Sequence, residues 1–425
     1  MIILANIPNL LRYYCVLRIT NPLLFRDIIY FELICHNKQF CFLVKQILLG
    51  QSLYLYDQKI LKENDKMKKI PKDLLKQYNA TRDPFQTHIF CHAPFRSLFF
   101  SLNGNVYTCC ANKKFVVGKY PKRSPREIWF GRKINRLRKK LISNNLSLGC
   151  NSCAENIKMG NFNIMASKIY DNVPTNEIYP SRLDFNLSNI CNLECIMCNG
   201  GDSSAIFKKQ KALTTLQTKQ YNLNLYGKKF VEEIREFIPH LKTAFFIGGE
   251  PFLIKVFYDL WEIFTEVNNE CELVIQTNGT ILSNKIKMLL EKGRFYFNVS
   301  LDSLDKKTFE MIRVNANFEK TMSNLEYFIE YAERKNTYTN LTVCPVQQNW
   351  KEIPHLVNFA NEKKISIYFN TVFKPGFCSF SGFNNKQRNE VIDYYSSFNF
   401  PEKTNWERIN KASFKTLINQ LRNFY

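Results

Sequence analysis

The sequence predicts an α/β fold: a partial (β/α)6, TIM-like barrel preceded by a small N-terminal cysteine-rich module made of a β-hairpin and a helix. Strand-like and helical runs alternate beyond residue 182, which is typical of parallel βα units. Polar or glycine-rich segments follow the strands, where a barrel gathers its functional groups. Eight of the 14 cysteines cluster in the module and after the first barrel strand.

The chain of 425 residues divides into four regions. They are an N-terminal region of unknown role (1–85), the cysteine-rich module (86–165), the barrel (180–380) and a C-terminal helical tail (381–425). The first region contains no recognisable motif, and both leader-peptide binding and plain packing remain open for it.

The module begins with the predicted hairpin. The runs SLFFSL and NVYTCC flank Asn103-Gly104, a dipeptide that favours a tight turn between two strands. A helix follows, with Ser124 as its candidate cap and Pro125 as its first residue. The basic run 132–140 also has helical spacing, with apolar residues on one face. We favour a solvent-facing helix there over a nucleic-acid patch.

Six strands and five helices make up the predicted barrel. The strands are Leu183–Leu187, Thr243–Ile247, Leu273–Gln276, Phe295–Val299, Leu341–Val346 and Ile365–Phe373. The helices are Lys229–Phe237, Phe252–Val267, Asn284–Glu291, Phe318–Arg334 and Pro354–Glu362. The tail beyond Asn384 is predicted to be helical.

The composition of the chain indicates which cellular location and which binding partners to expect. Charged residues interrupt every early apolar run, so we expect no secretory signal, no membrane span and a cytoplasmic location. Clustered cysteines in the cytoplasm indicate metal ligands, not disulfides. The net charge of +22 is spread along the chain, so nucleic acid stays open as a partner but is not favoured.

A cysteine triplet follows the first barrel strand: Cys191, Cys195 and Cys198. Three thiolates on one loop can ligate three irons of a cubane cluster and leave the fourth iron without a protein ligand. A zinc site or free core cysteines are the alternatives, but zinc needs a fourth ligand and none is near this loop in sequence. The later strands end in Gly248-Gly249-Glu250, in Thr277-Asn278, and in Ser300 followed by Asp302.

With these motifs in order, residues 182–375 resemble the radical S-adenosylmethionine (SAM) superfamily. The resemblance implies that the three cysteines hold a 4Fe-4S cluster whose open iron binds the methionine part of SAM. It implies reductive cleavage to a 5′-deoxyadenosyl radical, with electrons from a reductase, flavodoxin or ferredoxin.

The resemblance also implies which side chains contact SAM. Gly248, Gly249 and Glu250 would contact its amino group, and Ser300 and Asp302 its ribose or carboxylate. Position alone adds Thr277 and Asn278. Many members have an aromatic residue where this chain has Met197, a departure that concerns packing around the cluster more than ligation.

Four cysteines of the module form a second ligand set: Cys91, Cys109, Cys150 and Cys153. Cys110 competes with Cys109, because neighbouring strand residues point to opposite faces. The spacing is similar to the auxiliary-cluster fold SPASM in its shorter, single-cluster version called twitch, although the module here precedes the barrel. Met159 stands where the longer pattern has a further cysteine, so we expect one auxiliary cluster for electron transfer. A zinc knuckle is the alternative.

The leading hypothesis is a radical SAM enzyme that oxidises, cross-links or epimerises an unidentified substrate, with a peptide preferred by analogy. The alternatives are a radical SAM enzyme that modifies RNA and a non-catalytic iron-sulfur or zinc protein for electron transfer. No catalytic side chain is assigned. Cys344 and Cys378 are either hydrogen-atom donors or, more commonly for cysteine, buried free thiols.

Overall fold

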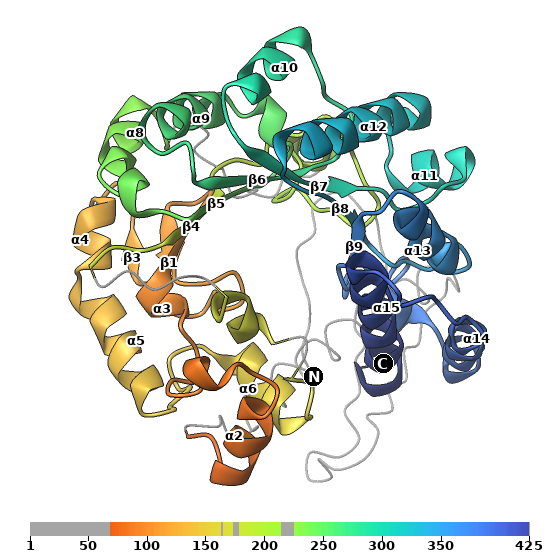
Figure 1. The fold of residues 1–425 in the computed structure, drawn as a ribbon, viewed down its shortest axis with the longest axis horizontal. Helices are drawn as coiled ribbons and strands as arrows, with labels where there is room; N and C mark the ends of the chain where they lie inside the picture. The colour runs from red at the N-terminus through yellow and green to blue at the C-terminus, as the bar shows by residue number, and fades with distance from the viewer. Residues whose placement is uncertain (1–68, 163–164, 173–177, 214–224, 425) are drawn as a thin grey trace, which may run out of the picture. The chain divides into compact units, whose positions relative to one another are not determined.

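The structure, a computed structural model, describes residues 69–162, 165–172, 178–213 and 225–424. Most of the predicted N-terminal region (1–85), namely residues 1–68, therefore lies outside the described residues. Nine strands form one sheet in the order β3-β2-β1-β4-β5-β6-β7-β8-β9. Figure 1 shows this sheet as a curved wall with helices on its outer side.

All six predicted barrel strands are present, and they run parallel in chain order. They are β4 (Arg182–Asn186), β5 (Thr243–Ile247), β6 (Glu272–Thr277), β7 (Phe295–Ser300), β8 (Thr339–Val343) and β9 (Ser366–Phe369). The last two end earlier than predicted. The backbone N–H of Cys344 leaves the sheet to donate to Asp302 (2.7 Å), and the apolar runs continue into loops.

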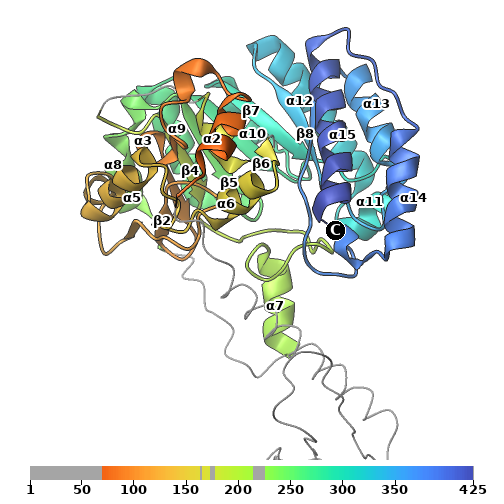
Figure 2. The same ribbon diagram turned by 90° about the horizontal axis from the view of Figure 1, so that it is seen from below.

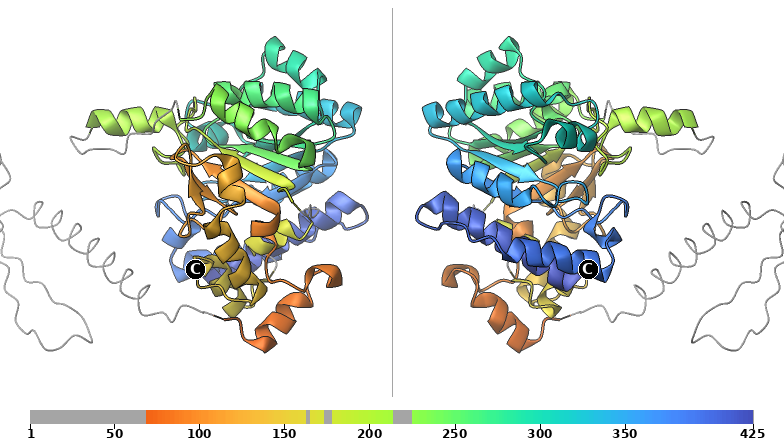
Figure 3. Two further views of the ribbon diagram at one scale, coloured as in Figure 1. Left: turned by 90° about the vertical axis from the view of Figure 1, so that its left-hand side faces the viewer. Right: turned by 90° about the vertical axis from the view of Figure 1, so that its right-hand side faces the viewer.

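One face of the sheet is apolar and covered by helices. Leu183 and Phe185 of β4 and Phe246 of β5 are fully buried on this side, because alternate residues of a strand point to the same face. Figure 3 shows the covering helices from both sides. They are α8 (Lys228–Arg235), α9 (Lys255–Val267), α10 (Asn284–Glu291), α12 (Phe318–Lys335) and α13 (Ile353–Glu362), which confirms the five predicted helices.

The cysteine-rich hairpin extends the barrel sheet, which the sequence analysis did not anticipate. Strand β1 (Ser97–Ser101) pairs antiparallel with β2 (Asn105–Tyr107), which pairs with β3 (Gly118–Lys119). On its other side β1 runs parallel to β4, with Phe99 opposite Asp184. The predicted turn is confirmed: Gly104 has a φ of 80°. The second strand ends at Tyr107, so Cys109 and Cys110 lie in the loop beyond it.

Helices complete the module. A capping box between Ser124 and Glu127 starts α4 (Pro125–Trp129), as the sequence predicts. Helix α5 (Arg132–Ile142) buries its apolar face, which confirms a helix over the basic run. Three shorter helices complete this part: α2 (Lys72–Asn79), α3 (Ala93–Arg96) and α6 (Asn151–Lys158).

The tail forms two helices, α14 (Asn385–Ser396) and α15 (Asn405–Phe424), as predicted. Asn410 of α15 closes the free edge of β9: its Oδ1 accepts from the Ile367 N–H (2.8 Å) and its Nδ2 donates to the Ile365 carbonyl (3.0 Å). An edge strand exposes unpaired backbone groups, and a side-chain amide replaces the missing neighbour here.

In the described part of the barrel region, the sequence analysis did not predict the helices α7 (Ser204–Leu213) and α11 (Lys306–Ile312). Figure 2 shows α7 projecting away from the strands. Across the described ranges, no helix combines the length and apolar character needed to cross a bilayer.

Candidate functional site

The triplet loop leaves the carboxyl end of β4 and is held by backbone hydrogen bonds. Glu194 N–H donates to Val314 O and Ile196 N–H donates to Ile312 O, both at 3.0 Å. Ser203 Oγ donates to Leu193 O (2.6 Å) from the start of the next segment. The loop is therefore fixed at the barrel mouth, where the carboxyl ends of parallel strands gather.

The three thiols face polar hydrogen-bond donors. Cys191 Sγ accepts from the Leu193 N–H (3.4 Å) and lies 3.9 Å from Asn278 Nδ2. A hydrogen bond from Cys198 lowers the pKa of the Cys195 thiol, whereas the same hydrogen bond raises the pKa of Cys198 and burial raises that of Cys191 to about 11. Three cysteine side chains on one loop match the three-cysteine donor set of a 4Fe-4S cluster.

Gly248 and Gly249 brace the stem of the triplet loop. A Cβ on Gly249 would lie 2.0 Å from Ile190 O, and its φ of 39° is unfavourable for residues with side chains. A Cβ on Gly248 would meet the Asn186 side chain at 2.4 Å. The sequence analysis expected these glycines to approach SAM, and the structure gives them a second reason to be glycine, since they pack against protein backbone.

Glu250 is fully buried beside this loop. Its carboxylate accepts hydrogen bonds from the Asn278 N–H (2.7 Å), Thr277 Oγ1 (2.8 Å) and the Phe252 N–H (3.2 Å). Burial raises the pKa of Glu250 to about 7, although the hydrogen bonds oppose this shift. Three of the predicted contact residues, from two strand ends, thus form one hydrogen-bonded group.

Asp302 and Ser300 have protein partners at the end of β7. Asp302 is fully buried and forms an ion pair with Arg313, with 2.8 Å between Oδ2 and Nε. Ser300 Oγ accepts from Gln276 Nε2 (3.1 Å). Sequence reasoning missed Arg313; the signal available was a lone cation between the apolar residues Ile312 and Val314.

The inner face of the sheet is lined by polar side chains. The strand register places Gln276 opposite Asn298, Asn298 opposite Asn340 and Asn340 opposite Ser366. Asn340 Nδ2 donates to Asn298 Oδ1 (3.2 Å), and Gln276 Nε2 donates to Thr342 Oγ1 (2.6 Å). Closed barrels fill their interior with branched aliphatic residues, whereas this row offers amide donors and acceptors to a ligand.

The module cysteines Cys91, Cys109, Cys150 and Cys153 line one cavity, together with Asn112. The Asn112 N–H donates to Cys109 Sγ (3.3 Å), and its Nδ2 lies 3.5 Å from Cys150 Sγ. The backbone N–H and the side-chain amide of this one residue therefore orient sulfurs from two separate segments. Four thiols around one cavity fit the donor set of a 4Fe-4S cluster.

Cys110 lies outside the lining of this cavity and its residue is exposed, whereas Cys109 is part of the lining. The two remaining candidates lie near the triplet loop: Cys378 is buried and its Sγ donates to Pro375 O (3.4 Å), and Cys344 is half-buried. Cys344 and Met197 belong to the small apolar cluster around Cys378 that packs under this loop.

A single zinc ion would need its ligands about 2.3 Å away, converging on one point. Among the residues that the structure describes, no three or more His, Cys, Asp or Glu side chains are gathered in a way that could hold one metal ion.

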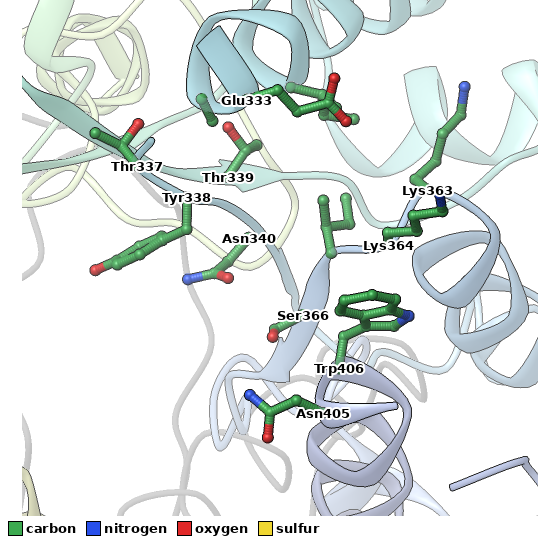
Figure 4. Close-up of a pocket in the computed structure, with 13 residues that line it drawn as sticks. Glu333, Thr337, Tyr338, Thr339, Asn340, Lys363, Lys364, Ser366, Asn405 and Trp406 are labelled. Atoms are coloured by element: carbon green, nitrogen blue, oxygen red, sulfur yellow. The ribbon is translucent and has the colours of Figure 1, made fainter. Parts of the chain in front are cut away.

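A separate pocket of about 190 Å³ lies at the opposite end of the barrel (Figure 4). Thr339 and Ser366 line it where β8 and β9 begin, and Asn405 and Trp406 contribute from α15. Because the triplet loop follows the carboxyl end of a parallel strand, we do not place the chemistry in this pocket.

Two family models match the chain. The radical SAM superfamily matches residues 185–360, and an iron-sulfur cluster-binding domain, SPASM, matches residues 91–154. The curated relatives include a GTP 3′,8-cyclase of Clostridium perfringens, 27% identical over 49% of this chain and 61% of its own length. The molybdenum cofactor biosynthesis protein moc-5 of Caenorhabditis elegans is 24% identical over 50% of this chain and 34% of its own length. The chain thus spans about three-fifths or less of these relatives.

Solved structures with some likeness include native anSMEcpe with bound AdoMet, at 20% identity and a TM-score of 0.38 over 51% of this chain and 59% of that one. Streptococcus suis SuiB bound to precursor peptide SuiA gives 17% identity and a TM-score of 0.37 over 62% and 50%. The family models agree with the order of motifs in the sequence, including the module ahead of the barrel. Residues 185–360 thus form a radical SAM domain, and a SPASM iron-sulfur cluster-binding domain over residues 91–154 precedes it in the chain.

Proposed function

We propose that this protein reductively cleaves SAM and uses the resulting radical to modify a polar substrate held in the barrel, with a peptide as the preferred class. The observation that carries the proposal is the meeting of three features at one barrel mouth. They are the triplet loop, the buried carboxylate of Glu250 and the polar side chains of Gln276 and Ser300 at the carboxyl ends of β6 and β7.

When bound, the two clusters supply the redox chemistry: one electron for cleavage of the SAM sulfonium to methionine and a 5′-deoxyadenosyl radical, and an acceptor for the electron of the oxidised substrate. Cys191, Cys195 and Cys198 would hold the first cluster. Glu250 would accept hydrogen bonds from the SAM amino group, because a buried carboxylate binds a cationic donor strongly.

The barrel interior orients the substrate. Gln276 and Asn298 present amide groups that can both donate and accept hydrogen bonds, which suits the backbone amides of a peptide. The peptide class also follows from the resemblance to enzymes with this auxiliary fold. The substrate lies between the mouth and the module in this arrangement.

The module would hold the auxiliary cluster through Cys91, Cys109, Cys150 and Cys153. Full ligation by four thiolates leaves no iron open for substrate, so electron transfer is its proposed role. Strand β1, which lies between Cys91 and Cys109 in the chain, pairs directly with β4, the strand that leads into the triplet loop.

A nucleotide is the second candidate substrate. Relatives matching about half of this chain carry the name GTP 3′,8-cyclase. GTP therefore belongs in the same assay as peptides, with the consumption of each followed by mass spectrometry.

Anaerobic reconstitution tests the proposal. We expect about eight irons per chain, as two clusters of four, and 5′-deoxyadenosine on reduction with SAM. Replacing Cys191, Cys195 and Cys198 with Ala should remove about half of the iron and all of the 5′-deoxyadenosine. Cys271→Ala is the matched control, because this cysteine is buried outside both sites. Wild-type protein that forms no 5′-deoxyadenosine would refute the proposal.

A further inference from the structure

A buried ion pair lies against the triplet loop. Arg313 Nε is 2.8 Å from Asp302 Oδ2, and both side chains are almost completely buried. Arg313 Nη1 is 4.0 Å from Cys195 Sγ. The guanidinium thus lies between a carboxylate on one side and a candidate cluster ligand on the other.

The backbone holds Arg313 in this place. The carbonyls of Ile312 and Val314 accept the N–H groups of Ile196 and Glu194, so these four residues bracket Arg313 and Cys195. Asp302 is fixed as well, because its Oδ1 accepts the Cys344 N–H (2.7 Å) and its carbonyl accepts from Asn349 Nδ2 (2.8 Å). The Asp302 carboxylate therefore cannot turn away without breaking a backbone hydrogen bond, and the Arg313 guanidinium has this carboxylate as its ion-pair partner.

We propose that Arg313 is a positioning residue that acts through Cys195 to raise the reduction potential of the cluster on the triplet loop, with Asp302 limiting the effect. One-electron reduction adds a negative charge to the cluster and makes or breaks no bond. A fixed cation beside a ligating sulfur stabilises the added charge, and the low dielectric of the interior strengthens this interaction. A neighbouring carboxylate opposes it.

This inference rests on the proposed function, since it needs a cluster on the triplet loop. Its test is a redox titration of the reconstituted protein with dithionite, in which electron paramagnetic resonance follows the two clusters separately. The triple variant of Cys191, Cys195 and Cys198 identifies the signal of the barrel cluster. The auxiliary cluster serves as the internal reference in every sample.

Arg313→Gln removes the cation. The equilibrium constant for reduction of the barrel cluster should fall at least tenfold, which corresponds to about 59 mV for one electron. Asp302→Asn keeps an acceptor for the Cys344 N–H and removes the opposing charge, so it should shift the potential in the other direction. Arg313→Lys keeps the cation and should remain closer to wild type than Arg313→Gln.

Arg334→Gln is the matched control, because Arg334 pairs with Glu291 on the surface. It should change the reduction potential of neither cluster.

Equal shifts in Arg313→Gln and Arg313→Lys would overturn the inference and assign the pair a structural role. Shifts of the same sign in Arg313→Gln and Asp302→Asn would do the same. If Arg313→Gln does not take up iron, Asp302→Asn and Arg313→Lys decide. A higher reduction potential of the barrel cluster in Asp302→Asn and a small shift in Arg313→Lys support the inference, and any other result overturns it. Wild type without a triplet-dependent signal would overturn both the inference and the proposed function.

Discussion

Glu250 shows how a single buried side chain couples the site to pH. With a pKa raised to about 7 by burial, its carboxyl is mostly charged at pH 8 and mostly protonated at pH 6. If the carboxylate receives the SAM amino group, SAM should bind more weakly as the pH falls from 8 to 6. Calorimetry on the reconstituted protein measures this change.

Glu250→Gln separates this effect from other titrations. The variant should bind SAM more weakly than wild type at pH 8 and should lose less affinity between pH 8 and 6, because no carboxyl remains to titrate at this position. An identical pH profile in both proteins would contradict the assignment of Glu250.

Cys109 and Cys110 offer a second comparison between single residues. Only Cys109 lines the cavity of the module. Cys109→Ala should therefore lose the auxiliary cluster, which lowers the iron content from about eight to about four, while Cys110→Ala should keep it. Iron analysis after anaerobic reconstitution decides, and iron loss in Cys110→Ala alone would reverse the assignment.

At this scale the sequence indicates residue types at strand ends but not all of their partners. Glu250, Thr277 and Asn278 lie together, as expected for residues at the ends of neighbouring parallel strands. The same reasoning does not show that Asp302 faces Arg313, because the pairing depends on how the segment after α11 folds back onto the triplet loop. A contact between distant segments produces no periodic pattern in the sequence, so it could not be predicted.

Some turns and strands depend on single residues whose backbone conformation few other residue types adopt easily. Gly104 turns the hairpin with a φ of 80°, and a Cβ there would lie 2.3 Å from Tyr120 O. Gly104→Ala should lower the free energy of unfolding by about 3 kcal/mol, since it combines backbone strain with overpacking.

Gly160→Ala is the control for this turn. Gly160 also has a positive φ of 69°, but nothing lies within 4 Å of the added Cβ, so only backbone strain of about 1 kcal/mol applies. Denaturant unfolding measures both variants. If both variants lose the same free energy of unfolding, the close approach of the added Cβ to Tyr120 does not contribute to the loss.

The edge of β9 depends on Asn410. Asn410→Ala removes the partners of the Ile367 N–H and the Ile365 carbonyl inside the protein, and unsatisfied buried groups cost about 1–3 kcal/mol each. We expect a loss of about 3 kcal/mol in the free energy of unfolding. Asn419→Ala, on the exposed side of the same helix, should change it by less than about 0.5 kcal/mol.

Elements with strong periodicity were predictable, and short or non-local ones were not. The helix over 132–142 and the six parallel strands follow from spacing alone. The helix α11 has only seven residues, too few for a clear period. The pairing of β1 with β4 joins segments about 85 residues apart, so nothing in either segment reveals it.

For the whole molecule, the continuous sheet joins the module to the barrel, while the two cysteine sets come from different segments: one loop carries the triplet, and three segments carry the module cysteines. Replacing Cys150 and Cys153 with Ala should remove about half of the iron and leave SAM cleavage intact, because the triplet loop is built from other residues. Substrate turnover should stop if the auxiliary cluster accepts electrons. Loss of 5′-deoxyadenosine formation in this variant would show instead that the barrel site depends on the module.

The junction of β1 and β4 spans five register pairs, from Ser97 opposite Arg182 to Ser101 opposite Asn186. A slip by one residue would turn Phe99 from the inner face to the helix-covered face, so the interior composition locks the alignment. If both clusters bind as proposed, this fixed alignment also determines how far apart the segments that carry the two cysteine sets begin.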